Sequence, residues 1–215
     1  PARDLLAGAD VNLKAEASEP LAALVFKTIV DPYGKISFVR VMSGTLSANS
    51  TVYNPRTRKD ERVGGVFTIR GKEQTAVEAV GPGDLAAMTK LKNTHFGDTL
   101  ASAGSNLQVP KIALPESMVK LAIVPKSRAD EDKIGEALNR LAEEDPTFSH
   151  YRDPATKEHV IKGMGDQQLE ILLDRMKNKF HVEAETRVPK VAYKETIKGT
   201  AEAQGKHKKQ TGGHG

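Results

Sequence analysis

The sequence has 215 residues, 38% of them hydrophobic and 28% charged, a composition typical of a globular protein with room for two cores. It contains no cysteine, which excludes disulfides, thiolate metal sites and cysteine nucleophiles. The net charge of +4 supports a nucleic-acid partner only weakly, and no apolar run is long enough to predict a membrane span.

Residues 1–20 are polar and show no sustained hydrophobic period, so we interpret them as a linker. The chain begins with a proline and ends in a glycine-rich run. We therefore expect it to be a fragment of a longer protein.

Residues 21–107 contain short strand patterns separated by frequent turns. Leu24 to Val30 is an apolar strand run, and Lys35 to Val41 alternates polar and apolar residues with the period of a strand. Ser43-Gly44 and Gly81-Pro82-Gly83-Asp84 supply turns. Strands this short with turns this frequent predict a small closed β-barrel.

A basic cluster lies on a predicted hairpin of this barrel, at Arg56, Arg58 and Lys59. One interpretation is a solvated basic turn, and the other is contact with the phosphates of a nucleic acid. The second makes these three residues candidates for a nucleic-acid interface.

Residues 108–190 follow the order β-α-β-β-α-β, which predicts an α+β ferredoxin-like domain. The first helix has Ile134, Ala137, Leu138 and Leu141 on one face, and Pro146 prevents its continuation beyond the preceding residue.

Gly163-Met164-Gly165 joins a strand to the second helix, whose apolar residues also have helical spacing. A dinucleotide fingerprint would need a third glycine where Gln168 stands, so we interpret this segment as a structural turn rather than a phosphate cradle.

Residues 191–215 begin a further domain that they do not complete. Val191 to Ile197 is a predicted strand, and the basic run after it contains Lys206, Lys208 and Lys209, which are further candidates for phosphate contact.

The sequence contains no Walker-type phosphate loop and no nucleophile elbow, and its six histidines are scattered. We therefore expect no catalytic residue, cofactor or metal in this chain. The enzyme alternative is an acylphosphatase-like hydrolase on the ferredoxin-like domain. Arg128 lies near the required loop for that chemistry, but no asparagine is placed to orient water.

From residue 21 onward the chain resembles the middle of elongation factor G, the bacterial translocation factor. The resemblance covers the barrel and the ferredoxin-like domain in a fixed order, through the following segments: Phe26 to Arg40, Gly83-Asp84 to Leu91, Gly97 to Leu100, Leu141 to Phe148, Gly163 to Gly165, Tyr193 to Ile197 and Gln210 to Gly215. Several unrelated motifs in one order make it specific.

The resemblance implies that the chain is the second and third domains, and the start of the fourth, of a ribosome-binding translational GTPase that couples GTP hydrolysis to translocation. GTP and Mg²⁺ would belong to the parent's GTPase domain, which this chain lacks. The implied partners are ribosomal RNA, a small-subunit protein and that GTPase domain. We expect a cytoplasmic monomer without membrane contact.

Two departures from the family favour a divergent paralogue. Where the family's third-domain helix usually opens Gly-Glu-Leu-His-Leu-Glu, this chain has Gly165-Asp166-Gln167-Gln168-Leu169-Glu170, and the run Lys206 to Lys209 is unusually basic. The alternatives are a ribosome-protection factor or another paralogue without translocase activity, or a stand-alone RNA-binding module.

Overall fold

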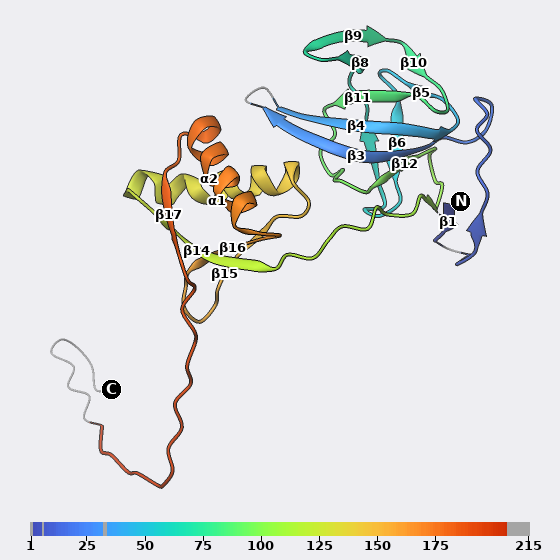
Figure 1. Ribbon diagram of the computed structural model, residues 1–215. Helices are drawn as coiled ribbons and strands as arrows, with labels where there is room; N and C mark the ends of the chain where they lie inside the picture. The colour runs from blue at the N-terminus through green and yellow to red at the C-terminus, as the bar shows by residue number, and fades with distance from the viewer. Residues whose placement is uncertain (1, 6, 32–33, 206–215) are drawn as a thin grey trace, which may run out of the picture.

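The structure, a computed structural model, describes residues 2–5, 7–31 and 34–205. Two hydrophobic cores divide the chain into a β-barrel and an α/β domain. Figure 1 shows the two domains side by side, with one end of α1 (Arg128–Glu144) next to the barrel and an extended segment joining them.

The barrel is built on an eight-stranded sheet in the order β7-β6-β12-β3-β4-β11-β8-β9, in which every neighbouring pair is antiparallel. Its strands are β3 (Ala22–Asp31), β4 (Gly34–Ser43), β6 (Thr51–Asn54), β7 (Lys59–Arg62), β8 (Val66–Arg70), β9 (Glu73–Val77), β11 (Leu85–Thr89) and β12 (Thr99–Ala101). A short ladder of β5 (Leu46–Ser47) with β10 (Ala79–Val80) completes it.

The chain connectivity requires this sheet to curl. β7 lies at one edge and β8 lies next to the other edge, yet only residues 63–65 join them. Three residues span roughly 10 Å, so the two ends of the sheet must approach each other. The alternating strands turn Val25, Val39 and Val41 into the enclosed core, as their period of two predicts.

Residues 2–5 and 7–20 are more structured than the expected linker. β1 (Ala2–Asp4) pairs with β2 (Asp10–Val11) on one side and with β13 (Leu107–Gln108) on the other. Strands of two or three residues carry no hydrophobic period, and β13, the second partner of β1, lies about a hundred residues away. Local sequence patterns therefore do not reveal this small sheet.

The α/β domain is a four-stranded antiparallel sheet in the order β15-β16-β14-β17, with α1 and α2 (Asp166–Phe180) packed on it through one core. The strands are β14 (Val119–Pro125), β15 (Ser149–Arg152), β16 (His159–Gly163) and β17 (Ala184–Arg187). The element order and sheet order are those of the predicted ferredoxin-like fold.

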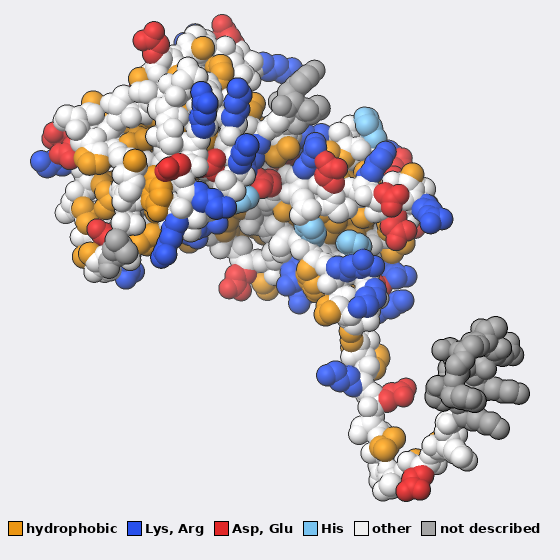
Figure 2. All heavy atoms as spheres, turned by 180° about the vertical axis from the view of Figure 1, so that it is seen from behind, with side chains coloured by type: hydrophobic (Ala, Val, Ile, Leu, Met, Phe, Trp, Pro, Cys, Tyr) orange, Lys and Arg blue, Asp and Glu red, His pale blue; other side chains and the backbone are white. Residues whose placement is uncertain are grey.

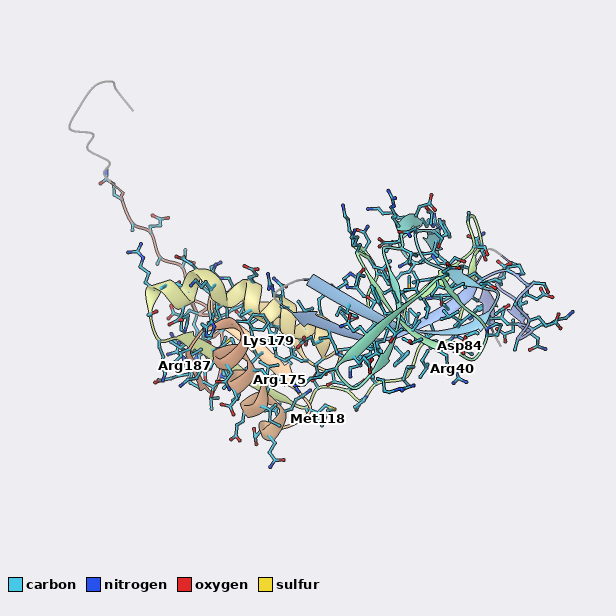
Figure 3. The ribbon with its side chains drawn as sticks, turned by 90° about the horizontal axis from the view of Figure 1, so that it is seen from above. Arg40, Asp84, Met118, Arg175, Lys179 and Arg187 are labelled. Carbon is cyan, nitrogen blue, oxygen red and sulfur yellow. The ribbon has the colours of Figure 1, made fainter. Side chains whose placement is uncertain are left out.

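The first helix, α1, begins and ends where the sequence signals stand. The Ser127 hydroxyl accepts a hydrogen bond from the Asp130 backbone N–H at the start of α1, and Pro146 follows the C-cap residue, Asp145. α2 ends at His181, which has the left-handed φ of 55° that closes many helices. Figure 3 shows the helices side by side, with Arg175 and Lys179 labelled on α2.

The strand expected at Val191 to Ile197 is not formed: residues 188–205 contain no helix or strand. A strand needs a neighbour to satisfy its backbone groups, and this segment leads away from both domains (Figure 1).

Candidate nucleic-acid interface

The predicted basic hairpin joins β6 to β7 at one edge of the barrel sheet. Arg58 adopts a left-handed backbone conformation, with φ of 54°, in the turn. The side chains of Arg58 and Lys59 are exposed, and neither forms an ion pair with any residue that the structure describes. Both cations are therefore available to a ligand.

Arg56 has a different environment from its two neighbours. Its guanidinium binds both carboxylate oxygens of Asp98, with Nη2 2.8 Å from Oδ2, and it also donates to the Asn93 carbonyl at 3.2 Å. Asp98 is 1% exposed and also accepts from the Asn54 side chain and the His95 backbone N–H, each at 2.9 Å. The three cations predicted together thus divide into one structural arginine and two free charges.

The ion pair shifts the pKa values of both Arg56 and Asp98. Burial alone would raise the pKa of Asp98, but Arg56, the His95 N–H and Asn54 stabilise the carboxylate, and the pKa lies below its ordinary value. The hydrogen bond to Asp98 raises the pKa of Arg56. The hairpin is therefore anchored by a charged pair at neutral pH.

A second buried carboxylate connects this hairpin to the loop that follows β11. Glu61 on β7 is 3% exposed and accepts from the backbone N–H groups of Lys92 and Asn93 and from the Thr94 hydroxyl. These bonds hold Lys92 beside the hairpin.

The basic surface is consequently wider than the sequence indicated. We call it the barrel basic band, and its exposed members are Arg58, Lys59 and Lys92. Figure 2 shows Lys and Arg side chains gathered on the barrel in a band that runs toward the α/β domain. Lys92 lies 33 residues after Lys59, so only the contact through Glu61 reveals that the two belong together.

The other predicted contact residues, Lys206, Lys208 and Lys209, lie outside the residues that the structure describes. They stay a prediction.

The two domains meet at the C-terminal end of α1, in a junction built on Glu143 and Glu144. Glu143 binds the Lys35 ammonium at 2.8 Å and His95 Nδ1 at 3.0 Å, both from the barrel. Glu144 accepts from the Val30 backbone N–H at 2.7 Å and also binds Lys179 on α2. We call these contacts the carboxylate junction.

The position of these two glutamates is locally unfavourable. The C-terminal end of a helix carries partial negative charge, and the last turn of α1 contains no basic residue that could offset it. The barrel supplies the missing positive charge through Lys35. Glu143 therefore meets its cations only when the two domains lie together, whereas Glu144 also has Lys179 of its own domain.

The glycine turn before α2 is held in place by hydrogen bonds of the Gln168 side chain. Gln168 accepts from the Met164 backbone N–H at 2.7 Å and donates to Asp145 Oδ2 and Thr147 Oγ1, each at 2.7 Å. An added Cβ at Gly163 would lie 2.6 Å from Gln168 Oε1, so glycine is required for close approach there. The segment is the structural turn that its sequence predicted.

Two further negative findings concern the described part of the chain. No group of three or more His, Asp or Glu side chains there is arranged to hold a metal ion. None of its helices has the length and apolarity needed to span a bilayer.

Comparisons with known proteins agree with this architecture. The family model described as Elongation factor G domain 2 matches residues 20–103, and the model described as Elongation Factor G, domain III matches residues 114–188. A crystal structure of a protein from Thermus thermophilus superposes with a TM-score of 0.73 at 35% sequence identity, covering 91% of this chain.

This chain spans 30% of the length of that Thermus protein. The two family matches fall on the barrel and on the α/β domain, in the order that the sequence motifs predicted. The chain belongs to the elongation factor G family, of which it carries the second and third domains.

Proposed function

We propose that this chain is the ribosome-binding middle of a translational GTPase, and that the barrel basic band contacts RNA of the small ribosomal subunit through its phosphates. The observation that carries the proposal is the division of the hairpin cations. Arg56 is held by Asp98, whereas Arg58 and Lys59 project from a rigid hairpin without partners among the described residues.

Contacts of this kind are electrostatic and independent of base sequence. Lysine and arginine side chains that replace counterions along a phosphate backbone give an affinity that falls steeply with salt. The band contains no exposed aromatic side chain for base stacking. It therefore suits positioning on folded RNA rather than reading of its sequence.

In the parent protein we propose that GTP hydrolysis takes place in a separate domain. This chain then transmits the resulting conformational change to the rest of the protein. The carboxylate junction supports transmission as a rigid pair, because Glu143 at the end of α1 meets its cations only in contact with the barrel.

One argument for a paralogue without translocase activity is weakened by the structure. Gln168, which stands where the family usually has histidine, still connects the glycine turn to Asp145 and Thr147. This departure preserves the local connection, so translocation remains our proposed role for the parent.

The test is sedimentation of the purified chain with isolated small ribosomal subunits over a series of salt concentrations. The double variant Arg58→Gln/Lys59→Gln is expected to reduce the slope of log affinity against log salt by about 1.5 to 2. Arg40→Gln is the matched control on the barrel, because Arg40 lies on β4, which β12 and β3 separate from the β6–β7 hairpin in the sheet, and Figure 3 shows it well away from α1 and α2. Binding by the unmodified chain that does not respond to salt would contradict the proposal.

A further inference from the structure

A groove lies between the two domains, next to the carboxylate junction. Its volume is about 440 Å³, and its walls come from both domains, with Lys35 and Lys92 on the barrel and Asn139, Arg140 and Glu143 on α1. Because neither domain forms the groove alone, any ligand in it contacts both domains.

The charge of the groove is positive. Lys35 and Glu143 bind each other, so their charges cancel, and the positive charge of the groove comes from Lys92 and from Arg140, which also pairs with Glu136. Lys92 is exposed and forms no ion pair with any residue in the described part of the chain. The groove therefore favours an anion.

Arg140 is held in place but keeps donors free. Its Nη2 binds Glu136 one turn earlier at 2.7 Å, and its guanidinium lies 5.9 Å from the centre of the Phe180 ring. A guanidinium has five N–H donors, and the contact to Glu136 uses only part of them. Its side chain is 40% exposed, so the remaining donors are accessible to a ligand.

The groove continues the barrel basic band. Lys92 belongs to both surfaces, because Glu61 fixes its backbone beside the hairpin while the residue also lines the groove. A phosphate backbone that lies on Arg58 and Lys59 can thus pass Lys92 and reach Arg140. An RNA backbone carries one negative charge per nucleotide, so cations placed along its path can each neutralise a different phosphate.

We propose that the interdomain groove binds the phosphate backbone of the same RNA segment that the barrel basic band holds, so that the two domains bind one RNA jointly. This inference rests on the proposed function and adds to it a second domain and a specific arginine on α1. It also gives the carboxylate junction a role, because Glu143 and Glu144 hold the groove walls together.

The experiment measures binding of the full chain to isolated small ribosomal subunits across a salt series. Arg140→Gln is expected to weaken binding about fivefold near 0.15 M salt and to reduce the salt slope by about 0.9, the effect of one lost phosphate contact. Lys92→Gln is expected to do the same. Arg140→Lys, which keeps the charge, is expected to restore most of the affinity.

The matched control is Arg175→Gln, an exposed arginine on α2 that does not line the groove. It is expected to leave both affinity and salt slope unchanged. Circular dichroism of every variant before and after the binding series checks that the fold is retained.

The junction supplies a test in which the joint-binding proposal and simple charge counting predict opposite changes in RNA affinity. The double variant Glu143→Gln/Glu144→Gln removes two negative charges, which by itself strengthens RNA binding. If the groove must be assembled from both domains, the same variant binds less tightly than the unmodified chain. Tighter binding by this variant would overturn joint recognition.

The two proposals fail in different ways. If Arg140→Gln binds as tightly as the unmodified chain while Arg58→Gln/Lys59→Gln does not, RNA contacts the barrel alone and the groove inference is wrong. If the unmodified chain shows no salt-dependent binding to small subunits, the proposed function itself is wrong.

Discussion

At the scale of single residues, Gly163 shows how close packing fixes a residue type. A methyl group there would meet Gln168 Oε1 at 2.6 Å and Leu169 Cδ2 at 2.8 Å. We expect Gly163→Ala to destabilise the α/β domain by about 1–3 kcal/mol, because both neighbours must shift out of a packed core. Thermal unfolding followed by circular dichroism measures the change.

Gly135→Ala is the control, with an expected effect of opposite sign. Gly135 lies in the middle of α1, and an added Cβ would meet no atom within 4 Å. The substitution should stabilise α1 by about 0.5–1 kcal/mol, since alanine loses less backbone entropy than glycine in a helix. Equal effects of the two substitutions would contradict the packing argument.

The ion pair of Arg56 with Asp98 gives a pH-dependent prediction. The pKa of Asp98 in the folded chain lies below its ordinary value of 3.8, so its stabilising contribution is complete above that value and is lost as pH falls through the lower folded pKa. Arg56→Gln removes the largest stabilising contact of the buried carboxylate. We expect a loss of about 1–2 kcal/mol at pH 7, less than for a fully buried pair because the Arg56 side chain is 37% exposed.

The same substitution should move acid unfolding to higher pH, because the pKa of Asp98 rises when its cation is removed. Urea unfolding at several pH values between 3 and 7 measures this shift. Arg58→Gln changes the same charge two residues away without touching Asp98, and is expected to leave stability nearly unchanged. If both variants lose stability equally, the hairpin does not depend on the Arg56 pair.

At the scale of elements, the carboxylate junction predicts how α1 is held against the barrel. Replacing Glu143 and Glu144 by glutamine removes both charges that Lys35 and Lys179 bind. We expect the distance between the domains to become more variable. Fluorescence energy transfer between dyes at Lys72→Cys and Arg175→Cys measures this, and the labelling is specific because the chain has no cysteine.

Glu170→Gln, a matched change at an exposed position of α2, should leave the distance distribution unaltered. Raising the salt concentration should broaden the distribution of the unmodified chain only partly, since the Lys35 and Glu143 side chains are 17% and 29% exposed and are incompletely screened. A distribution that is identical in the glutamine variant would mean that other contacts set the domain orientation.

The elements themselves followed from sequence wherever a period was long enough. Ile134, Ala137, Leu138 and Leu141 lie buried on one face of α1, as their spacing predicted. Strands β1 and β2 escaped prediction because each has only two or three residues, too few for a hydrophobic period, and because the second partner of β1 is the distant β13. Val191 to Ile197 had the composition of a strand but no neighbour to pair with.

The candidate site was predictable only in part for the same physical reason. Arg56, Arg58 and Lys59 are adjacent in sequence, so their charge is visible there, but the anchor of Arg56 lies 42 residues away at Asp98. The contact of Lys35 with Glu143 joins residues 108 apart. No local pattern distinguishes an arginine that is free from one that is already paired.

At the scale of the whole molecule, two cores joined by a polar junction predict how the chain unfolds. The barrel core and the α/β core share no residue, so each domain can unfold by itself, whereas the carboxylate junction is lost when either one does. Differential scanning calorimetry should therefore show two coupled transitions. Gly163→Ala should mainly lower the midpoint of the α/β transition and, through the junction, lower the barrel midpoint by a smaller amount. Val39→Ala, which opens a cavity in the barrel core, should do the reverse.

The glutamine variant of the junction separates coupling from stability. It changes neither core, so both domains keep their packing, but unfolding of one no longer removes contacts from the other. We expect the shift that Gly163→Ala causes in the barrel transition to disappear in the background of Glu143→Gln/Glu144→Gln. If Gly163→Ala still moves both transitions there by the same amounts, the domains communicate through the extended connector between β13 and β14, and the two glutamates act only locally.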